Sequence, residues 1–312
     1  MMHEIQSIAL IGAGAIGALY TSLLESNGIP VTLIADGERA TRLEHEGFSV
    51  NGKNYHPLVR RPDSPDARPH DLVVVAVKYH QLDSAIQLIR PFVGSDTIIL
   101  SLLNGIDSEE KIGNVYGLHR ILYSYVVGTD AFREGNAITY HNAGTIVFGE
   151  RTNKELSESV QAVQDLFERG GISYEIPADM MRSMWWKFMV NVGVNQASAI
   201  LRAPYGVFLE IEEAKAIMEA AMREVIAVST KLGIGLDESD IDAWYPVLSK
   251  LSPSGKTSML QDMEAGRKTE VEMFSGALIR LAQDAGCAVP VNEMLYNAIR
   301  AQERMKGIIS PR

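Results

Sequence analysis

A glycine-rich turn near the start of the chain has the spacing of a phosphate-binding loop. The apolar run at residues 7–11 leads directly into Gly12-x-Gly14-x-x-Gly17, and apolar residues at helical spacing follow. In such a strand–turn–helix unit the first glycine allows the turn, the second lets a pyrophosphate approach the backbone, and the third lets the helix pack against the sheet. The free N–H groups of the helix N-terminus then face the anion. The pattern predicts dinucleotide binding, with cofactor contacts from Gly12, Ala13, Gly14, Ala15, Ile16 and Gly17.

An acidic residue, Asp36, closes the second predicted strand, 19 residues beyond Gly17. A carboxylate at this place accepts hydrogen bonds from the ribose hydroxyls of NAD and repels the 2′-phosphate of NADP. The alternative interpretation is that Asp36 only caps the helix predicted at residues 38–46, and the two roles are compatible. Arg39 and Arg42 lie close by in the sequence and are suited to a phosphate, so the choice between the two cofactors stays open at this point.

Two polar residues follow predicted parallel strands directly. Lys78 comes directly after the strand predicted at residues 71–77, which is apolar from Leu72 onward, and Asn104-Gly105 comes after the strand predicted at 98–103. Because the carboxyl ends of parallel strands face the ligand crevice, both side chains are candidates for cofactor or substrate contacts. The alternatives are a solvated lysine at a strand end and an ordinary Asn-Gly turn.

Lys187, Asn191 and Asn195 are spaced four residues apart in an otherwise apolar helical segment. This spacing places the three side chains on one face of a helix. Lysine is almost never fully buried without a partner. The stripe therefore either faces a cleft or contains side chains that satisfy one another inside the protein. Trp185 and Trp186 fit packing roles better than ligand contacts.

A third polar cluster begins at Thr257-Ser258 and continues to Glu270 and Glu272. Thr257 or Ser258 is a candidate helix cap, and Gln261 stands three residues after Ser258, as in a capping box. The two glutamates are candidate catalytic groups, and the alternative is that they form a solvated run of charge.

The elements that must position these residues change in kind near residue 179. Before it, strands alternate with helices and predict a doubly wound α/β domain at 1–178. After it, strand signals end and long amphipathic segments predict an all-helical domain at 179–312. We expect strands at 31–35, 71–77, 98–103, 121–127, 137–140 and 145–148, the last two as a hairpin, and a further hairpin turn at Asn51-Gly52.

The composition excludes several classes of function. The chain has 312 residues and a net charge of −10, and no basic cluster offsets that charge, so we expect no nucleic-acid partner. Cys287 is the only cysteine, which favours a reducing, cytoplasmic setting. The start of the chain does not read as a signal peptide, and no long uncharged apolar run predicts a membrane span. The scattered histidines predict no metal site. The apolar helical half is suited to a homodimer interface or to an internal core.

Taken together and in this order, the clusters resemble the ketopantoate reductase (2-dehydropantoate 2-reductase) family. The matches are the glycine loop, Val77-Lys78, Asn104-Gly105, Trp186-Lys187-x-x-x-Asn191-x-x-x-Asn195, Ser258-Met259-Leu260-Gln261-Asp262 and Thr269-Glu270. The resemblance spans nearly the whole chain. It implies a Rossmann domain and a helical domain, with the active site in the cleft between them.

The resemblance also implies the reaction, the reduction of 2-dehydropantoate to (R)-pantoate with NAD(P)H in pantothenate and coenzyme A biosynthesis. Lys187 is then the catalytic lysine, and Glu270 helps to hold the substrate and the lysine. Asn104, Asn191, Asn195 and Ser258 are then the polar groups on the substrate side. A cationic lysine stabilises the negative charge that hydride delivery leaves on the ketone oxygen, and Glu270 nearby would favour the charged lysine.

One departure from the family concerns the cofactor. Many members have an arginine at the end of the second strand, where it serves the NADP 2′-phosphate, and this chain has Asp36. We therefore expect NADH to be favoured over NADPH.

Two other functions are alternatives to the reduction of 2-dehydropantoate. One is a dehydrogenase of another branched 2-oxo or 3-hydroxy acid, because Lys-x-x-x-Asn also resembles 3-hydroxyacid dehydrogenases. The other is a dinucleotide-binding sensor without turnover.

Overall fold

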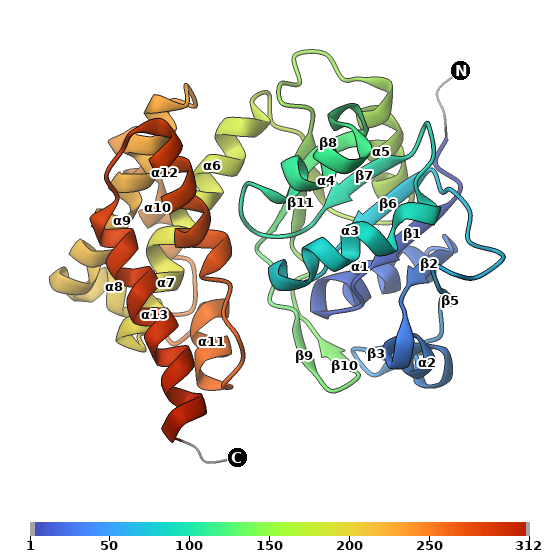
Figure 1. Cartoon of the computed structure of the whole chain (residues 1–312), viewed down its shortest axis with the longest axis horizontal. Helices are drawn as coiled ribbons and strands as arrows, with labels where there is room; N and C mark the ends of the chain where they lie inside the picture. Colours follow the sequence, from blue (N-terminus) through green and yellow to red (C-terminus); the bar gives the residue numbers. More distant parts are fainter. Residues whose placement is uncertain (1–3, 310–312) are drawn as a thin grey trace. The chain divides into compact units, whose positions relative to one another are not determined.

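The computed structural model describes residues 4–309 of the chain. It divides into two compact units, Met1–Met180 and Met181–Arg312. The first unit is a mixed α/β structure and the second is helical, as Figure 1 shows. The predicted fold class, a Rossmann-type sheet followed by a helical domain, is confirmed.

The first unit is built on an eight-stranded sheet in the order β12-β11-β8-β7-β6-β1-β2-β5. The strands from β8 to β5 are parallel to their neighbours, and β11 runs antiparallel to β8. The strand order reverses direction beside β1, which is where ligands bind in open α/β sheets. The strands are β1 Ile8–Ile11, β2 Val31–Ile34, β5 Leu58–Arg60, β6 Leu72–Val75, β7 Ile98–Ser101, β8 Ile121–Val127, β11 Thr145–Gly149 and β12 Tyr174–Glu175.

Helices cover both faces of this sheet, which explains why the two middle strands of its parallel part, β1 and β6, are apolar at every position. Leu10 of β1 belongs to one core cluster, together with residues of α1 and α5. Its neighbour Ile11 belongs to the other cluster, together with residues of α3 and α4. Successive strand residues point to opposite faces, so both faces need apolar side chains. The helices are α1 Ala15–Ser26, α2 Gly37–Glu46, α3 Leu82–Leu88, α4 Ser108–Tyr116 and α5 Glu158–Arg169, with short 3₁₀ turns η1 Tyr79–Gln81, η2 Arg90–Phe92 and η3 Leu118–Arg120.

A second, four-stranded sheet has the order β4-β3-β10-β9. Its strands are β3 Phe48–Val50, β4 Lys53–Tyr55, β9 Phe132–Glu134 and β10 Ala137–Thr139. The predicted turn at Asn51-Gly52 is confirmed: both residues have positive φ, and β3 and β4 are antiparallel. The predicted hairpin between the strands at 137–140 and 145–148 is wrong. β10 pairs with β3 and β9, whereas β11 pairs with β8 and β12 in the main sheet.

The second unit has no strand among its described residues, 181–309. Two π-helical segments, η4 Asn191–Asn195 and η5 Glu272–Gly276, interrupt its α-helices. Within residues 4–309 no helix has the length and apolar character needed to cross a membrane. The α-helices are α6 Met180–Val190, α7 Gln196–Leu201, α8 Val207–Glu210, α9 Glu212–Lys231, α10 Glu238–Leu248, α11 Ser258–Glu264, α12 Ala277–Ala285 and α13 Pro290–Ile309.

A buried carboxyl group lies at the carboxyl end of β7 in the first unit. Glu109 is 1% exposed, and burial is the main reason that its pKa rises from 4.5 to about 7. Ser108 Oγ donates to Glu109 Oε2 at 2.8 Å and lies 2.8 Å from Ser101 Oγ. Ser124 N donates to Glu109 Oε1 at 3.4 Å. These bonds favour the charged carboxylate, but the loss of hydration outweighs them.

Replacing Glu109 with Gln tests this balance through the pH dependence of stability. The folded wild-type chain keeps the proton up to about pH 7, whereas the unfolded chain loses it near its ordinary pKa. The wild type therefore loses stability as pH rises between these values, by about 3 kcal/mol in total. We expect the urea midpoint of Glu109→Gln to fall less than that of the wild type between about pH 5 and about pH 8.

The matched control is Glu110→Gln, at the exposed neighbouring position. It should follow the wild-type pH dependence. Equal pH dependence of the wild type and Glu109→Gln would show that Glu109 stays ionised in the folded chain.

Candidate active site

The glycine loop has the shape that a pyrophosphate requires. Gly12 has φ +105°, and a Cβ there would lie 2.5 Å from the Ala76 carbonyl. A Cβ at Gly17 would lie 2.1 Å from Gly12 O, so only glycine permits this approach of α1 to the loop. A Cβ at Gly14 would meet its nearest neighbour, Gly12 O, at 4.0 Å. The backbone is therefore packed on the inner side and open at Gly14, and no side chain caps the N-terminus of α1.

Asp36 is exposed and lies beside this loop, because β1 and β2 are paired with Ile11 opposite Ile34. It occupies the N-cap position of α2, but its side chain makes no capping hydrogen bond. Across the described part of the chain, its carboxylate has no hydrogen-bond or ion-pair partner. The carboxylate is thus available to a ligand, and the interpretation of Asp36 as only a side-chain cap loses its basis.

Lys78 and Asn104 follow the carboxyl ends of the strands next to β1. The register pairs Ile11 with Val75 and Val75 with Ser101, so the segments after β1, β6 and β7 leave the sheet at one edge. Lys78 is exposed and precedes η1. Asn104 is half-buried in the turn after β7, beside Gly105 with φ +94°. Its side-chain amide makes no hydrogen bond to any residue that the structure describes.

In the second unit, Asn191, Asn195 and Ser258 form a directed chain of hydrogen bonds. Ser258 Oγ donates to Asn195 Oδ1 at 3.4 Å, and Asn195 Nδ2 donates to Asn191 Oδ1 at 3.1 Å. The chain ends at Asn191 Nδ2, a buried donor without a partner. An unpaired buried donor costs about 1–3 kcal/mol, so such a group is a candidate ligand contact.

The cap of α11 explains why Ser258 is available to Asn195. Thr257 is the N-cap, and its hydroxyl accepts the Leu260 N–H at 3.2 Å. The predicted capping box that joins Ser258 and Gln261 is therefore wrong, because Ser258 is the first residue of the helix. Gln261 Nε2 instead donates to Lys256 O at 3.1 Å.

Lys187 lies one helical turn before Asn191 and is partly buried. Burial lowers the pKa of its ammonium group to about 8. Its Nζ forms no hydrogen bond or ion pair within residues 4–309, and no carboxylate offsets the loss of hydration. A lysine with a pKa close to the working pH is suited to proton donation.

Glu270 lies in the bend just before η5, and no ion pair joins it to Lys187. The expected stabilisation of the charged lysine by Glu270 is therefore not formed in this structure. Glu272 has polar partners in α13. It accepts a hydrogen bond from the Tyr296 hydroxyl at 2.8 Å and forms an ion pair with Arg300 Nε at 3.6 Å. The neighbouring Thr269 is held by Glu303 of α13, which accepts both its N–H and its hydroxyl.

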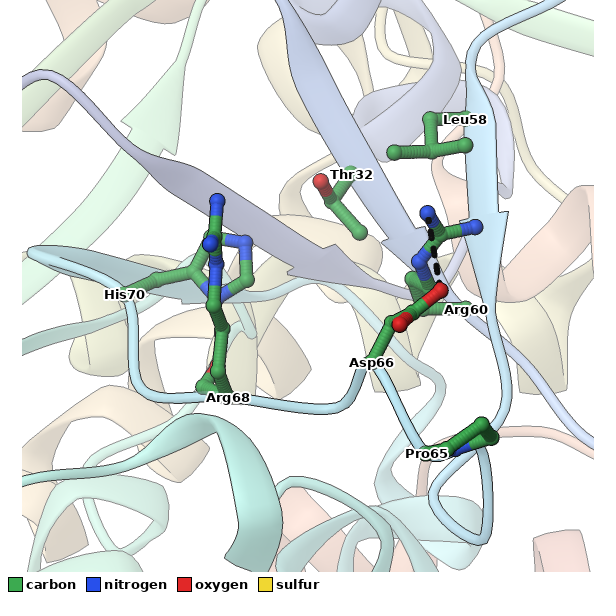
Figure 2. A pocket seen from close by; sticks show the side chains of 7 residues that line it. All are labelled: Thr32, Leu58, Arg60, Pro65, Asp66, Arg68 and His70. Carbon is green, nitrogen blue, oxygen red and sulfur yellow. Dashed lines mark hydrogen bonds and ion pairs between the residues drawn. The ribbon is translucent and has the colours of Figure 1, made fainter.

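The first unit has a hollow on its surface. Figure 2 shows the side chains that line it, from β2, β5 and the loop that leads to β6. None of the residues predicted to bind cofactor or substrate is among them. Within residues 4–309 no cluster of His, Cys, Asp and Glu is suited to a metal ion. The lining residues are Thr32, Leu58, Arg60, Pro65, Asp66, Arg68 and His70.

Comparison with known protein families shows to which family the chain belongs. Residues 8–153 match the family described as ketopantoate reductase PanE/ApbA, and residues 179–303 match its C-terminal part. The chain belongs to the ketopantoate reductase family. The suspected resemblance is thus confirmed, and the family is one of oxidoreductases.

Individual relatives extend the match over nearly the whole chain. A 2-dehydropantoate 2-reductase of Pyrococcus horikoshii is 28% identical over 96% of this chain and 98% of its own length. A 2-dehydropantoate 2-reductase structure from Geobacter metallireducens has a TM-score of 0.83 at 26% identity, covering 95% of this chain and 99% of that one. A D-mandelate dehydrogenase with NADH and anilino(oxo)acetate has a TM-score of 0.85 at 23% identity, covering 96% and 98%. The last likeness is one of fold alone.

Sequence reasoning missed the buried polar network that supports η4. Asn292 of α13 receives a hydrogen bond from Gln196 Nε2 at 3.2 Å, and its own Nδ2 donates to Glu224 at 2.7 Å. Ser275 Oγ of η5 lies 2.6 Å from Gln196 Oε1 and 2.9 Å from Asn292 Oδ1. Single polar residues in amphipathic helices carry no sequence signal for such a network, because their partners lie far away along the chain.

Asn191→Leu tests whether the unpaired amide binds ligand. The substitution keeps the size of the side chain and removes the donor, so the binding of a carboxylate-bearing substrate should weaken. A saturating ligand stabilises the folded state by about 2.7 kcal/mol at 100 times its Kd, which raises Tm. We expect ketopantoate with a nicotinamide cofactor to raise the Tm of the wild type clearly, and that of Asn191→Leu much less.

Asn297→Leu, at an exposed position of α13, serves as the matched control and should respond as the wild type does. An unchanged ligand-induced shift in Asn191→Leu would remove Asn191 from the site.

Proposed function

We propose that the protein reduces 2-dehydropantoate to (R)-pantoate with a nicotinamide cofactor, as a step of pantothenate and coenzyme A biosynthesis. The observation that carries the proposal is the partly buried Lys187, with a pKa of about 8, one helical turn before the unpaired Asn191 amide. The names of the curated relatives support the substrate. Assembly as a homodimer stays a prediction from the sequence.

The first unit supplies the groups that would hold the cofactor. The open backbone at Gly14 and the N-terminus of α1 fit a pyrophosphate, and the unpartnered Asp36 carboxylate fits ribose hydroxyls. Lys78 and Asn104 follow neighbouring strands at the same edge of the sheet and are proposed as further contacts. When bound, the nicotinamide supplies the hydride that reduces the ketone carbon.

Lys187 is proposed as the proton donor to the ketone oxygen. Negative charge develops on that oxygen during reduction, and an ammonium group beside it stabilises this charge before it transfers the proton. Burial makes the ammonium a stronger acid than a solvated lysine, since the neutral form is favoured. Asn191, Asn195 and Ser258 are proposed to bind the substrate carboxylate and hydroxyl with neutral dipoles, and Glu270 is proposed to help hold the substrate.

A pH–rate profile tests the role of Lys187. Because the protonated lysine is the active form, kcat/KM for ketopantoate reduction should be highest below about pH 8 and fall as pH rises through the lysine pKa. Lys187→Ala should retain cofactor binding and lose turnover by about 10²–10⁴-fold, the usual contribution of a general acid. Nicotinamide absorbance with ketopantoate, 2-oxoisovalerate and 3-hydroxyisobutyrate measures both effects.

The outcomes separate the alternatives. Near-wild-type activity in Lys187→Ala would refute its role. A clear preference for 2-oxoisovalerate or 3-hydroxyisobutyrate would support a dehydrogenase of another branched acid, and cofactor binding without turnover would support a sensor.

Asp36 is proposed to favour NADH over NADPH. Its exposed carboxylate repels the 2′-phosphate and accepts hydrogen bonds from ribose hydroxyls. The ratio of kcat/KM for NADH to that for NADPH should exceed one in the wild type, and Asp36→Arg should shift it toward NADPH. Glu38→Arg, at the exposed position two residues further on, is the control for a general gain of positive charge. A wild-type preference for NADPH would contradict the proposal.

A further inference from the structure

The small second sheet brings an arginine to the glycine loop. Arg133 lies in β9, and the β9–β10 hairpin pairs with β3, beside α2 in Figure 1. Arg133 Nη1 donates a hydrogen bond to the carbonyl oxygen of Ala13, between the first two glycines of the loop. Its Nε donates to Gly135 O at 2.7 Å. Two carbonyl groups therefore orient the guanidinium, and donors remain for a further acceptor.

Two more arginines contribute to the positive charge around Arg133. Burial is the main reason that the pKa values of Arg133 and Arg39 are lowered. Nearby positive charge lowers them further, since Arg39 and Arg42 of α2 act on Arg133 and Arg42 acts on Arg39. Among the described residues neither Arg39 nor Arg42 forms an ion pair or a hydrogen bond through its guanidinium. Asp36 is the carboxylate that acts on Arg39. Asp36 forms no ion pair with Arg39, so the guanidinium groups of Arg39 and Arg42 stay available to a bound anion.

We propose that Arg133 binds the diphosphate that NADH and NADPH share. The guanidinium is hydrogen-bonded to Ala13, next to Gly14, where the backbone is open and α1 begins. Selection against the 2′-phosphate belongs instead to Asp36, at the end of β2. This inference rests on the proposed function only in that the chain binds a nicotinamide dinucleotide.

The role of the second sheet follows from this assignment. β9 and β10 leave the main sheet after β8 and return to it at β11, so they add no strand to it. Their pairing with β3 places Arg133 over a loop that lies 120 residues earlier in the chain. The hairpin is thus a support for one phosphate-binding side chain.

The test compares binding of four probes: NADH, NADPH, ADP and adenosine. ADP carries the diphosphate without nicotinamide or 2′-phosphate, and adenosine carries neither phosphate. Arg133→Gln should weaken NADH, NADPH and ADP by a common factor of about 10–100, and leave adenosine unchanged. Isothermal titration gives each Kd without any turnover, and circular dichroism with Tm verifies that the variant is folded.

Two further variants make the result specific. Arg133→Lys keeps the charge and should recover part of the affinity for NADH, NADPH and ADP. Arg68→Gln removes an exposed arginine of the same unit, in the hollow of Figure 2, and should bind every probe as the wild type does.

Unchanged affinities in Arg133→Gln would overturn the inference, as would a loss confined to NADPH, which would assign Arg133 to the 2′-phosphate. A wild type that binds NADH but does not reduce ketopantoate would refute the proposed substrate alone, and the comparison of variants would still decide the role of Arg133. A wild type that binds none of the dinucleotides would overturn both proposals.

Discussion

One hydrogen bond between two amides, from Asn195 Nδ2 to Asn191 Oδ1, orients the polar side chains of the site proposed in the second unit. It uses the acceptor of Asn191 and so turns the Nδ2 group of this residue away from Asn195, where no partner meets it. Ser258 sets the direction of this bond. Its hydroxyl donates to Asn195 Oδ1, so Asn195 turns its Nδ2 group, a donor, toward Asn191. A row of three neutral groups thus ends in one unsatisfied donor, one turn from a lysine whose burial makes it a better acid.

The helix that carries this row depends on the packing of its far side. The π-helical turn at η4 adds width to the helix, and π turns are often found at functional sites. Gly193 allows it to approach α9, since a Cβ there would lie 2.6 Å from Met222 Cγ and 3.0 Å from Met218 O. Behind it, the bonds among Gln196, Asn292 and Ser275 satisfy buried polar groups that would otherwise destabilise the core. The stable polar network and the unsatisfied amide therefore occupy neighbouring positions of one segment.

The sequence predicted those features that leave a local pattern. Gly12 and Gly17 were identified from the spacing of the glycine motif, although the backbone that a Cβ at Gly12 would meet, at Ala76, is distant in sequence. The apolar strands were identified because both faces of a parallel sheet are covered. The pairing of β10 with β3 was missed, because it joins segments 88 residues apart and short strands carry little pattern. Arg133 was missed for the same reason: its partner, Ala13, is distant in sequence. The shared face of Lys187 and Asn191 was predicted from spacing, but the π turn and the unpaired amide depend on tertiary contacts.

The sites proposed in the two units differ in the groups that they offer to an anion. In the first, backbone N–H groups at a helix N-terminus and a group of arginines offer positive charge, which suits phosphates that stay charged throughout a reaction. In the second, the proposed groups are neutral amides and a hydroxyl, and the ammonium group of Lys187 lies one helical turn before Asn191. A second fixed cation there would lower the pKa of Lys187 further and reduce the share of chains that hold the proton at neutral pH. Neutral dipoles bind a carboxylate without that penalty, so the choice of asparagine over arginine near Lys187 keeps the lysine both acidic and largely protonated.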